Sequence, residues 1–289
     1  MKNEAVEAQI RAAQRGELTE YHIYDRLSKT TSSERIRDIL QRISKDELRH
    51  YELFREYTGR EEKPVRIKIW FFYLVSRIFG LTFGLKLMEQ GEDRAQSAYR
   101  NIAEEFPMAL NIAREENEHE ERLIEMIQEE RLGYMDSTIR GLNDALVELT
   151  GALAGFTFAL QQPQLIAMAG LITGIAGSLS MGVTEFLAKK SEEGSHNPLK
   201  SALYTGIAYV ITVILLVLPY LLLENIYISL GIMVVVALFI IMFFNYYLAV
   251  IKNVSFRKKF TEMALLSMGI ALLSFGIGFA VRLGLGVDI

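Results

Sequence analysis

Two quartets of the form Glu-x-x-His in the first half of this chain have the spacing of metal ligands. They run from Glu47 to His50 and from Glu116 to His119. Glutamate and histidine three residues apart lie on one face of a helix, so both side chains can reach the same ion. A bundle in which two helices each supply Glu and two others each supply Glu-x-x-His holds a pair of iron or manganese ions. The quartets therefore predict two thirds of the ligands of such a centre.

The remaining ligands are predicted by a second repeat. Gly-Glu followed by six residues and Tyr begins at Gly16 and again at Gly91, once before each quartet. We therefore expect a duplicated helical pair whose further ligands are Glu17 and Glu92. Glu89, one helical turn before Glu92, is the alternative carboxylate, although the register of the repeat favours Glu92.

Other side chains of this half have two readings each. Tyr24 and Tyr99, seven residues after Glu17 and Glu92, either hydrogen-bond a metal carboxylate or fill the core. An acidic cluster around the second quartet is expected to be a solvated helix face, with a funnel for cations as the alternative. Its members are Glu115, Glu118, Glu120, Glu121 and Glu125.

Charge divides the chain into two domains. Residues 1–136 hold 22 of the 31 basic and 27 of the 35 acidic side chains. We predict a soluble domain over 1–135 and a membrane domain over 136–289. The second contains five apolar stretches of spanning length, at 140–161, 164–188, 201–223, 226–250 and 262–284. The absence of cysteine leaves oxygen and imidazole as the main metal ligands, and the net charge of −4 gives no sign of a nucleic-acid partner.

The distribution of cations predicts the topology. The loops after the second and fourth spans are basic, whereas the loops after the first and third spans carry no cation. By the positive-inside rule, the basic loops and the N-terminal domain face the cytoplasm and the C-terminus lies outside. We expect an integral protein of a prokaryotic cell membrane. The basic residues are Lys189, Lys190, Lys200, Lys252, Arg257, Lys258 and Lys259.

One further apolar segment, residues 69–87, is nearly long enough to span a bilayer. If it did, the two quartets would lie on opposite sides of the membrane. We therefore expect one long helix over 65–103, whose aromatic start packs in the bundle, at a dimer contact or against the membrane surface. The soluble domain is then all-α, with four helices near 3–29, 32–58, 65–103 and 105–132.

Residues 1–132 resemble the ferritin-like superfamily in its rubrerythrin branch, on the repeated Glu-x6-Tyr and Glu-x-x-His phrases. The resemblance implies a four-helix bundle with a di-iron site, Fe²⁺/Fe³⁺ as the cofactor, and Mn²⁺ as the second candidate metal. Rubrerythrins proper add a cysteine-ligated iron module, which this chain lacks.

The membrane half resembles the vacuolar iron transporter family in two motifs. These are Gly141 to Glu148 in the first span and Gly174 to Ala188 in the second. Where that family reads Asn-Asp-Gly and Gly-Glu-Tyr, this chain has Asn-Asp-Ala at 143–145 and Thr-Glu-Phe at 184–186. The family's cytoplasmic metal-binding insert is missing. The resemblance implies a five-span dimeric exporter that exchanges divalent metal for protons, in an arrangement resembling membrane-bound ferritins that export iron.

The residue types within these spans agree with transport. An ionisable group inside a span is costly, by about 3 kcal/mol, and usually marks an ion pathway. Asp144 and Glu148 are one turn apart and share a face, as do Met181 and Glu185. Carboxylates suit a hard divalent ion, and a thioether favours transition metals over Mg²⁺ and Ca²⁺. Capping or snorkelling is the competing interpretation of the acids.

Together these features predict a proton-coupled exporter of Fe²⁺, with Mn²⁺ as a second candidate, in which the soluble domain captures, senses or oxidises iron. The expected partners are Fe²⁺, protons, the lipid bilayer and a second copy of the chain. The main alternative is a membrane-anchored di-iron oxidase with ferroxidase activity. An anchor, however, needs neither five spans nor acids within them. Iron storage at a membrane is a third hypothesis.

Overall fold

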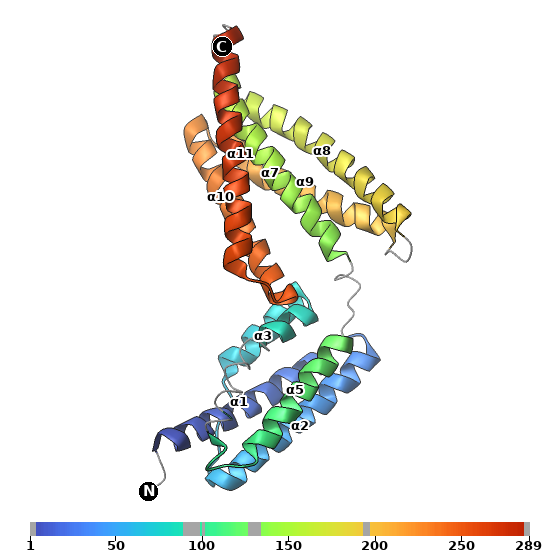
Figure 1. Cartoon of the computed structure of the whole chain (residues 1–289), viewed down its shortest axis with the longest axis vertical. Coiled ribbons are helices and arrows are strands. Elements are labelled where there is room, and N and C mark those ends of the chain that lie inside the picture. The colour runs from blue at the N-terminus through green and yellow to red at the C-terminus, as the bar shows by residue number, and fades with distance from the viewer. Residues whose placement is uncertain (1–3, 89–98, 100–101, 127–133, 193–196, 286–289) are drawn as a thin grey trace. The chain divides into compact units, whose positions relative to one another are not determined.

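A computed structural model describes residues 4–88, 99, 102–126, 134–192 and 197–285. Within these residues the regular structure is helical (Figure 1). Contacts divide the chain into Met1–Gln128 and Glu129–Ile289, and each unit is described by itself. The helices are α1 (Glu4–Ser28), α2 (Glu34–Thr58), α3 (Arg66–Phe79), α5 (Ala109–Met126), α7 (Met135–Leu160), α8 (Pro163–Ser191), α9 (Pro198–Leu222), α10 (Ile226–Lys252) and α11 (Phe256–Leu285).

Helices α1 and α2 form the scaffold of the N-terminal unit. A short connection joins them and they pack along their length. Ser33 caps the start of α2 by accepting a hydrogen bond from the backbone N–H of Ile36. Gly59 ends α2 in the left-handed conformation that glycine adopts without strain. Both helices lie close to their predicted ranges of 3–29 and 32–58.

The prediction of one continuous helix over 65–103 is wrong at Gly80. Helix α3 ends at Phe79, and Gly80 has φ 99° and ψ 151°, outside the helical region. The chain is helical again over residues 81–88, where Leu85 and Met88 join Ile69 in one core. A Cβ on Gly84 would lie 1.9 Å from Oγ of Ser76, so the two segments pack closely. The apolar stretch therefore folds back within the N-terminal unit.

A second core closes the other end of this unit. Ile10 of α1 and Phe54 of α2 pack against Tyr99, Ile102 and Phe106. Aromatic contacts stabilise this core further, since the ring centroids of Phe54 and Phe106 are 4.9 Å apart. Helix α5 begins two residues after Pro107, close to the predicted start at 105.

The membrane unit is built around α7. This helix contacts α8, α9, α10 and α11, and its side chains Ala145, Leu146, Leu149 and Leu153 are fully buried. Four of the helices have the length and apolar composition to cross a bilayer, namely α8, α9, α10 and α11. The fifth predicted span lies in α7, which Asp144 and Glu148 make more polar. Asp144 is partly exposed and Glu148 is exposed within this chain, and the crossing of the bilayer by α7 stays a prediction.

Close helix contact in this unit depends on glycine. A Cβ on Gly278 of α11 would lie 2.3 Å from the carbonyl oxygen of Gly155 in α7. A Cβ on Gly141 would lie 2.4 Å from the carbonyl oxygen of Thr205 in α9. Small residues of this kind let the backbones of membrane helices approach each other.

We expect Gly278→Ala to destabilise the membrane unit by about 1–3 kcal/mol, because the added methyl group forces α11 away from α7. The measurement heats the detergent-solubilised protein and uses size-exclusion chromatography to find the temperature at which half of the monodisperse protein is lost. Gly276→Ala is the matched control, since a Cβ there meets nothing within 4 Å. Equal midpoints for the two variants would contradict the packing argument.

Candidate metal centre and membrane pocket

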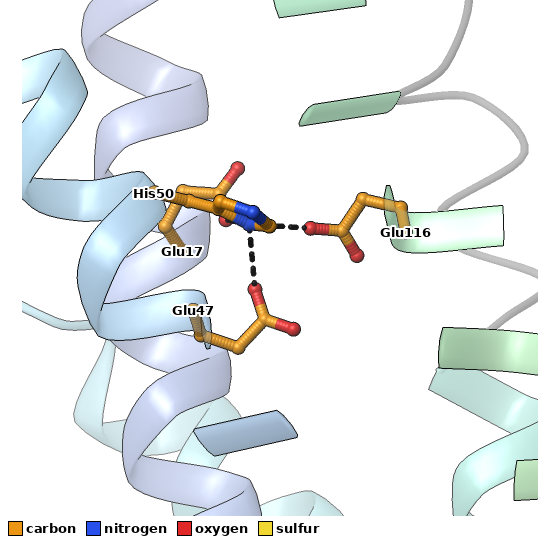
Figure 2. Close-up of side chains that lie close together, drawn as sticks. All are labelled: Glu17, Glu47, His50 and Glu116. Atoms are coloured by element: carbon orange, nitrogen blue, oxygen red, sulfur yellow. Dashed lines mark hydrogen bonds and ion pairs between the residues drawn. The ribbon is translucent and has the colours of Figure 1, made fainter. Parts of the chain in front are cut away.

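Four of the predicted ligands meet in a buried cluster in the N-terminal unit. Helix α1 supplies Glu17, α2 supplies Glu47 and His50, and α5 supplies Glu116 (Figure 2). One possible ligand atom from each lies within 4.8 Å of the others. Nδ1 of His50 is 3.0 Å from Oε1 of Glu116 and 3.4 Å from Oε2 of Glu17. Three carboxylates and an imidazole form a donor set suited to Fe²⁺ or Mn²⁺.

Three buried polar atoms in and beside this cluster make no hydrogen bond with the described residues. Among the described residues, Oε2 of Glu17, Oε2 of Glu47 and Nδ1 of His119 are buried and accept or donate no hydrogen bond. Leaving such atoms unsatisfied costs free energy, and native proteins seldom do so without a reason. A divalent cation held by the cluster would satisfy the oxygens of Glu17 and Glu47, so the residues present could hold a metal.

The second quartet approaches the cluster from the other side. Nδ1 of His119 is 3.9 Å from Oε1 of Glu47, and the rings of His50 and His119 are stacked with centroids 6.3 Å apart. Glu47 therefore lies between the two imidazoles, where it could be shared by two ions. The predicted ligands Glu89 and Glu92 lie outside the described residues.

Two acids that the sequence analysis did not propose as metal-site residues orient these histidines. Asp46 lies 3.0 Å from Nε2 of His119, and Glu115 lies 2.9 Å from Nε2 of His50. Each acid directly precedes one quartet and binds the histidine of the other quartet. Arg49 contacts both carboxylates. Nε2 can thus donate to an acid while Nδ1 faces the cluster, the usual arrangement of metal-binding histidines.

This arrangement corrects the expectation for Glu115, which belongs to the site and not only to a solvated face. The signal was present in the sequence, since Asp46-Glu47 and Glu115-Glu116 repeat with the quartets. Tyr99 takes the hydrogen-bonding role, because its hydroxyl donates to Oε1 of Glu17. Tyr24 is buried in the core of Ile23, Leu27 and Leu40.

We expect Asp46→Asn to weaken metal binding at this centre by about 10–100-fold, the usual effect of losing the partner of a ligating histidine. The readout is the rise in unfolding temperature with added Mn²⁺. Trp70 is the sole tryptophan and lies in α3, so its fluorescence follows this unit. Asp38→Asn, an exposed site on the same helix, is the control. Equal metal responses in both variants would refute a role for Asp46.

Burial and mutual repulsion change how these groups ionise. Burial raises the pKa of Glu47 well above the usual range of glutamate, and the neighbouring charge of Glu116 adds to this. Burial also raises the pKa of Glu116. Burial by itself would lower the pKa of His50, but the nearby carboxylates of Glu116 and Glu17 outweigh that effect and raise it strongly.

Metal binding at this centre should therefore release protons. Groups with a raised pKa keep their protons to higher pH, and each must lose its proton to bind an ion. We expect the Mn²⁺ affinity of the centre to rise between about pH 6 and about pH 8. Calorimetric titration of native protein and Glu47→Gln, in buffers of different ionisation enthalpy, counts the protons. If the difference in Mn²⁺ affinity between the native protein and Glu47→Gln is the same at every pH, metal binding does not displace a proton from Glu47.

A second candidate site lies in the membrane unit. Asp144 and Glu148 of α7 line a cavity of about 540 Å³ together with Met181 of α8. The other lining residues are Ile172, Thr173, Ala176, Gly177 and Ser180. Two carboxylates and a thioether thus converge between two helices.

Glu148, one helical turn after Asp144 in α7, accepts a hydrogen bond from a tyrosine. The hydroxyl of Tyr209 in α9 donates to Oε2 of Glu148 over 2.7 Å, and Tyr209 is fully buried. A Cβ on Gly177 would lie 2.3 Å from this hydroxyl. Glycine at 177 therefore leaves room for the pair, which sequence reasoning did not single out.

Glu185, the fourth predicted transport residue, is not among the residues that line the cavity. Its side chain is buried, and Oε1 accepts a 2.6 Å hydrogen bond from Ser137. Nε of Arg140 lies 3.4 Å from Oε2. The structure thus brings three predicted transport residues together and holds the fourth in a separate polar contact between α7 and α8.

Apolar helices of spanning length define an integral membrane protein, and acids inside such a unit are typical of an ion site. The chain belongs to the VIT family, whose family model matches residues 135–196 and 191–279. That membership is consistent with transport of iron or manganese. The match begins at residue 135 and leaves the N-terminal helical unit without a family. A search of curated proteins found no match to the chain.

Proposed function

We propose that this protein exports Fe²⁺ from the cytoplasm in exchange for protons, with Mn²⁺ as a second candidate substrate. The observation that carries the proposal is the cavity between α7 and α8, where Asp144, Glu148 and Met181 converge. Membership of the VIT family supports a divalent metal as the cargo. The thioether favours transition metals, since Mg²⁺ and Ca²⁺ prefer oxygen ligands.

Proton exchange follows from the chemistry of carboxylates. Asp144 and Glu148 can hold a divalent ion only when ionised, and protonation from the far side of the membrane would release it. The hydrogen bond from Tyr209 keeps the carboxylate of Glu148 oriented in both states. The sequence has no phosphate-binding loop of the P-loop kind, so a proton gradient is the energy source we propose.

The N-terminal unit is, in this proposal, a ferritin-like metal centre that captures iron. Glu17, Glu47, His50 and Glu116 would hold one ion, and His119 would contribute to a second. A bound iron pair would add redox chemistry. The protein side chains bind the ion, exchange protons with water and, through Asp46 and Glu115, orient the histidines.

Topology and assembly complete the proposal. The basic residues Lys189 and Lys190 at the end of α8, and Arg257 to Lys259 at the start of α11, support a cytoplasmic N-terminal unit by the positive-inside rule. We propose a homodimer, because the cavity is lined from α7 and α8 alone and Ile172, one of its lining residues, is 64% exposed. A second copy could cover this side and add ligands.

The alternative is a membrane-anchored di-iron oxidase. The buried four-ligand cluster favours it, because such a donor set could also support oxidation of Fe²⁺. An anchor does not explain why the membrane unit brings Asp144 and Glu148 together around one cavity.

Fe²⁺ flux into liposomes distinguishes these functions. The purified chain is reconstituted with its N-terminal unit outside, an iron indicator inside and an acidic interior. We expect Fe²⁺ entry that stops when an ionophore collapses the proton gradient. Oxygen consumption that depends on Glu47, without any Fe²⁺ or Mn²⁺ entry, would overturn the exporter and support the oxidase.

A further inference from the structure

Helix α3 presents an apolar face that the described residues of its unit leave largely exposed. Five large side chains on it are between 49% and 83% exposed. Their spacing of three and four residues puts them in one arc about 100° wide. The face consists of Ile67, Trp70, Phe71, Leu74 and Ile78. The opposite side of α3, with Ile69 and Ser76, is the buried one. The exposed face is therefore additional to the packing that holds α3 in place.

Cations border this face on both sides. On a helical wheel Arg66 and Arg77 lie along one edge and Lys68 lies along the other, and all three are exposed. The guanidinium of Arg26 stacks on Trp70 at 3.7 Å. From residue 63 to residue 88 the chain has five Lys or Arg and no acid, although the surrounding domain is acidic.

We propose that this face of α3 docks onto the headgroup layer of an anionic bilayer. An amphipathic helix with Trp and Phe on its apolar face and Lys or Arg along its edges lies in the membrane interface. The apolar side chains would enter the acyl boundary, while the long basic side chains reach the lipid phosphates.

The chain itself favours lipid as the occupant. Only residues 127–134 separate the end of α5 from the start of α7, and an extended chain of that length spans at most about 30 Å. A bilayer that holds α7 to α11 is thus within reach of the N-terminal unit at high local concentration. A second copy of α3 is a poorer partner, because pairing two such faces would bring like charges together.

Trp70 makes the proposal testable in the intact chain, since there is no other tryptophan. The full-length protein is reconstituted into liposomes of phosphatidylcholine and phosphatidylglycerol, with or without bromine on the acyl chains. We expect brominated lipid to quench Trp70 and the bilayer to shield it from aqueous acrylamide. Both effects should weaken in liposomes of phosphatidylcholine alone.

Charge and apolar variants separate the contributions. The double variant Arg66→Gln with Lys68→Gln should lower the docked-to-free ratio by about fivefold for each cation removed. Arg42→Gln with Lys45→Gln, exposed on α2, is the matched control and should change nothing. Ile67→Asn with Ile78→Asn should abolish quenching by brominated lipid without unfolding the unit, because both side chains are exposed.

Three results would overturn the proposal. Free access of acrylamide with no quenching by lipid would show a bare face. If neither acrylamide nor brominated lipid quenches Trp70, and this protection is lost when each liposome holds a single copy, the face of α3 is covered by self-association. If Trp70 is protected from both quenchers at every ratio of protein to lipid, other parts of the same chain cover the face of α3. None of these outcomes depends on metal transport, so they leave the proposed function untouched.

Discussion

Replacing Asp144 by asparagine should stop Fe²⁺ transport while leaving the membrane unit folded. The substitution keeps the size of the side chain but removes a charge that lines the cavity with Glu148 and Met181. Removing one partner of a desolvated charge pair costs about 2–5 kcal/mol, so we expect a loss of at least about 30-fold. Glu148→Gln should have a similar effect, with the hydroxyl of Tyr209 then facing a neutral amide. The liposome flux assay with a proton gradient measures both.

Folding and charge effects can be separated in this experiment. Glu224→Gln removes an exposed acid between α9 and α10, away from the cavity residues, and should transport like the native chain. Thermal midpoints in detergent show whether the variants remain folded. If Asp144→Asn and Glu148→Gln both transport at the native rate, the cavity is not the ion pathway and the proposed mechanism fails.

Replacing Glu47 by glutamine should have two opposite effects on the N-terminal unit. Metal affinity should fall by about 100-fold or more. Losing a residue that only hydrogen-bonds a metal ligand already costs about 10–100-fold, and Glu47 is itself a proposed ligand. The metal-free unit should become more stable near neutral pH. Burial raises the pKa of Glu47, so its ionised form destabilises the folded state above the pKa of the unfolded chain, and glutamine removes that cost.

Unfolding of the full chain, followed by Trp70 fluorescence with and without Mn²⁺, measures both effects. Glu52→Gln, an exposed acid on the same helix, should keep the native metal response. If Glu47→Gln keeps its Mn²⁺ response, the cluster of Glu17, His50 and Glu116 is not a metal centre. A metal-free variant that is less stable than the native chain would instead mean that the carboxylate of Glu47 is a net structural support.

Much of the candidate metal centre could be predicted because the residues that form it follow helical periodicity. A three-residue spacing puts Glu47 and His50 on one face, and the duplication indicates that Glu116 must meet them. The cross-pairing of Asp46 with His119 and of Glu115 with His50 could not be predicted. It depends on how α2 and α5 face each other, and helical spacing describes one helix at a time.

The break at Gly80 was missed for a similar reason. Helical periodicity and apolar content continue through residues 69–87, so a local reading favours one helix. The burial of Leu85 and Met88 against Ile69 favours a turn back into the core. Glycine makes that turn possible without strain, because it lacks a Cβ.

Residue types and their spacing limit the kinds of chemistry that are available to this protein. Charge divides the chain into two parts, hydropathy indicates membrane helices, and the Glu-x-x-His spacing indicates candidate metal ligands. Which side chains contact one another depends on how the helices pack. That packing puts Asp144, Glu148 and Met181 around one cavity, while Ser137 and Arg140 hold Glu185 elsewhere. The physical reason is that periodicity sets the direction of a side chain around its own helix, whereas contacts between helices depend on packing that residues distant in sequence share.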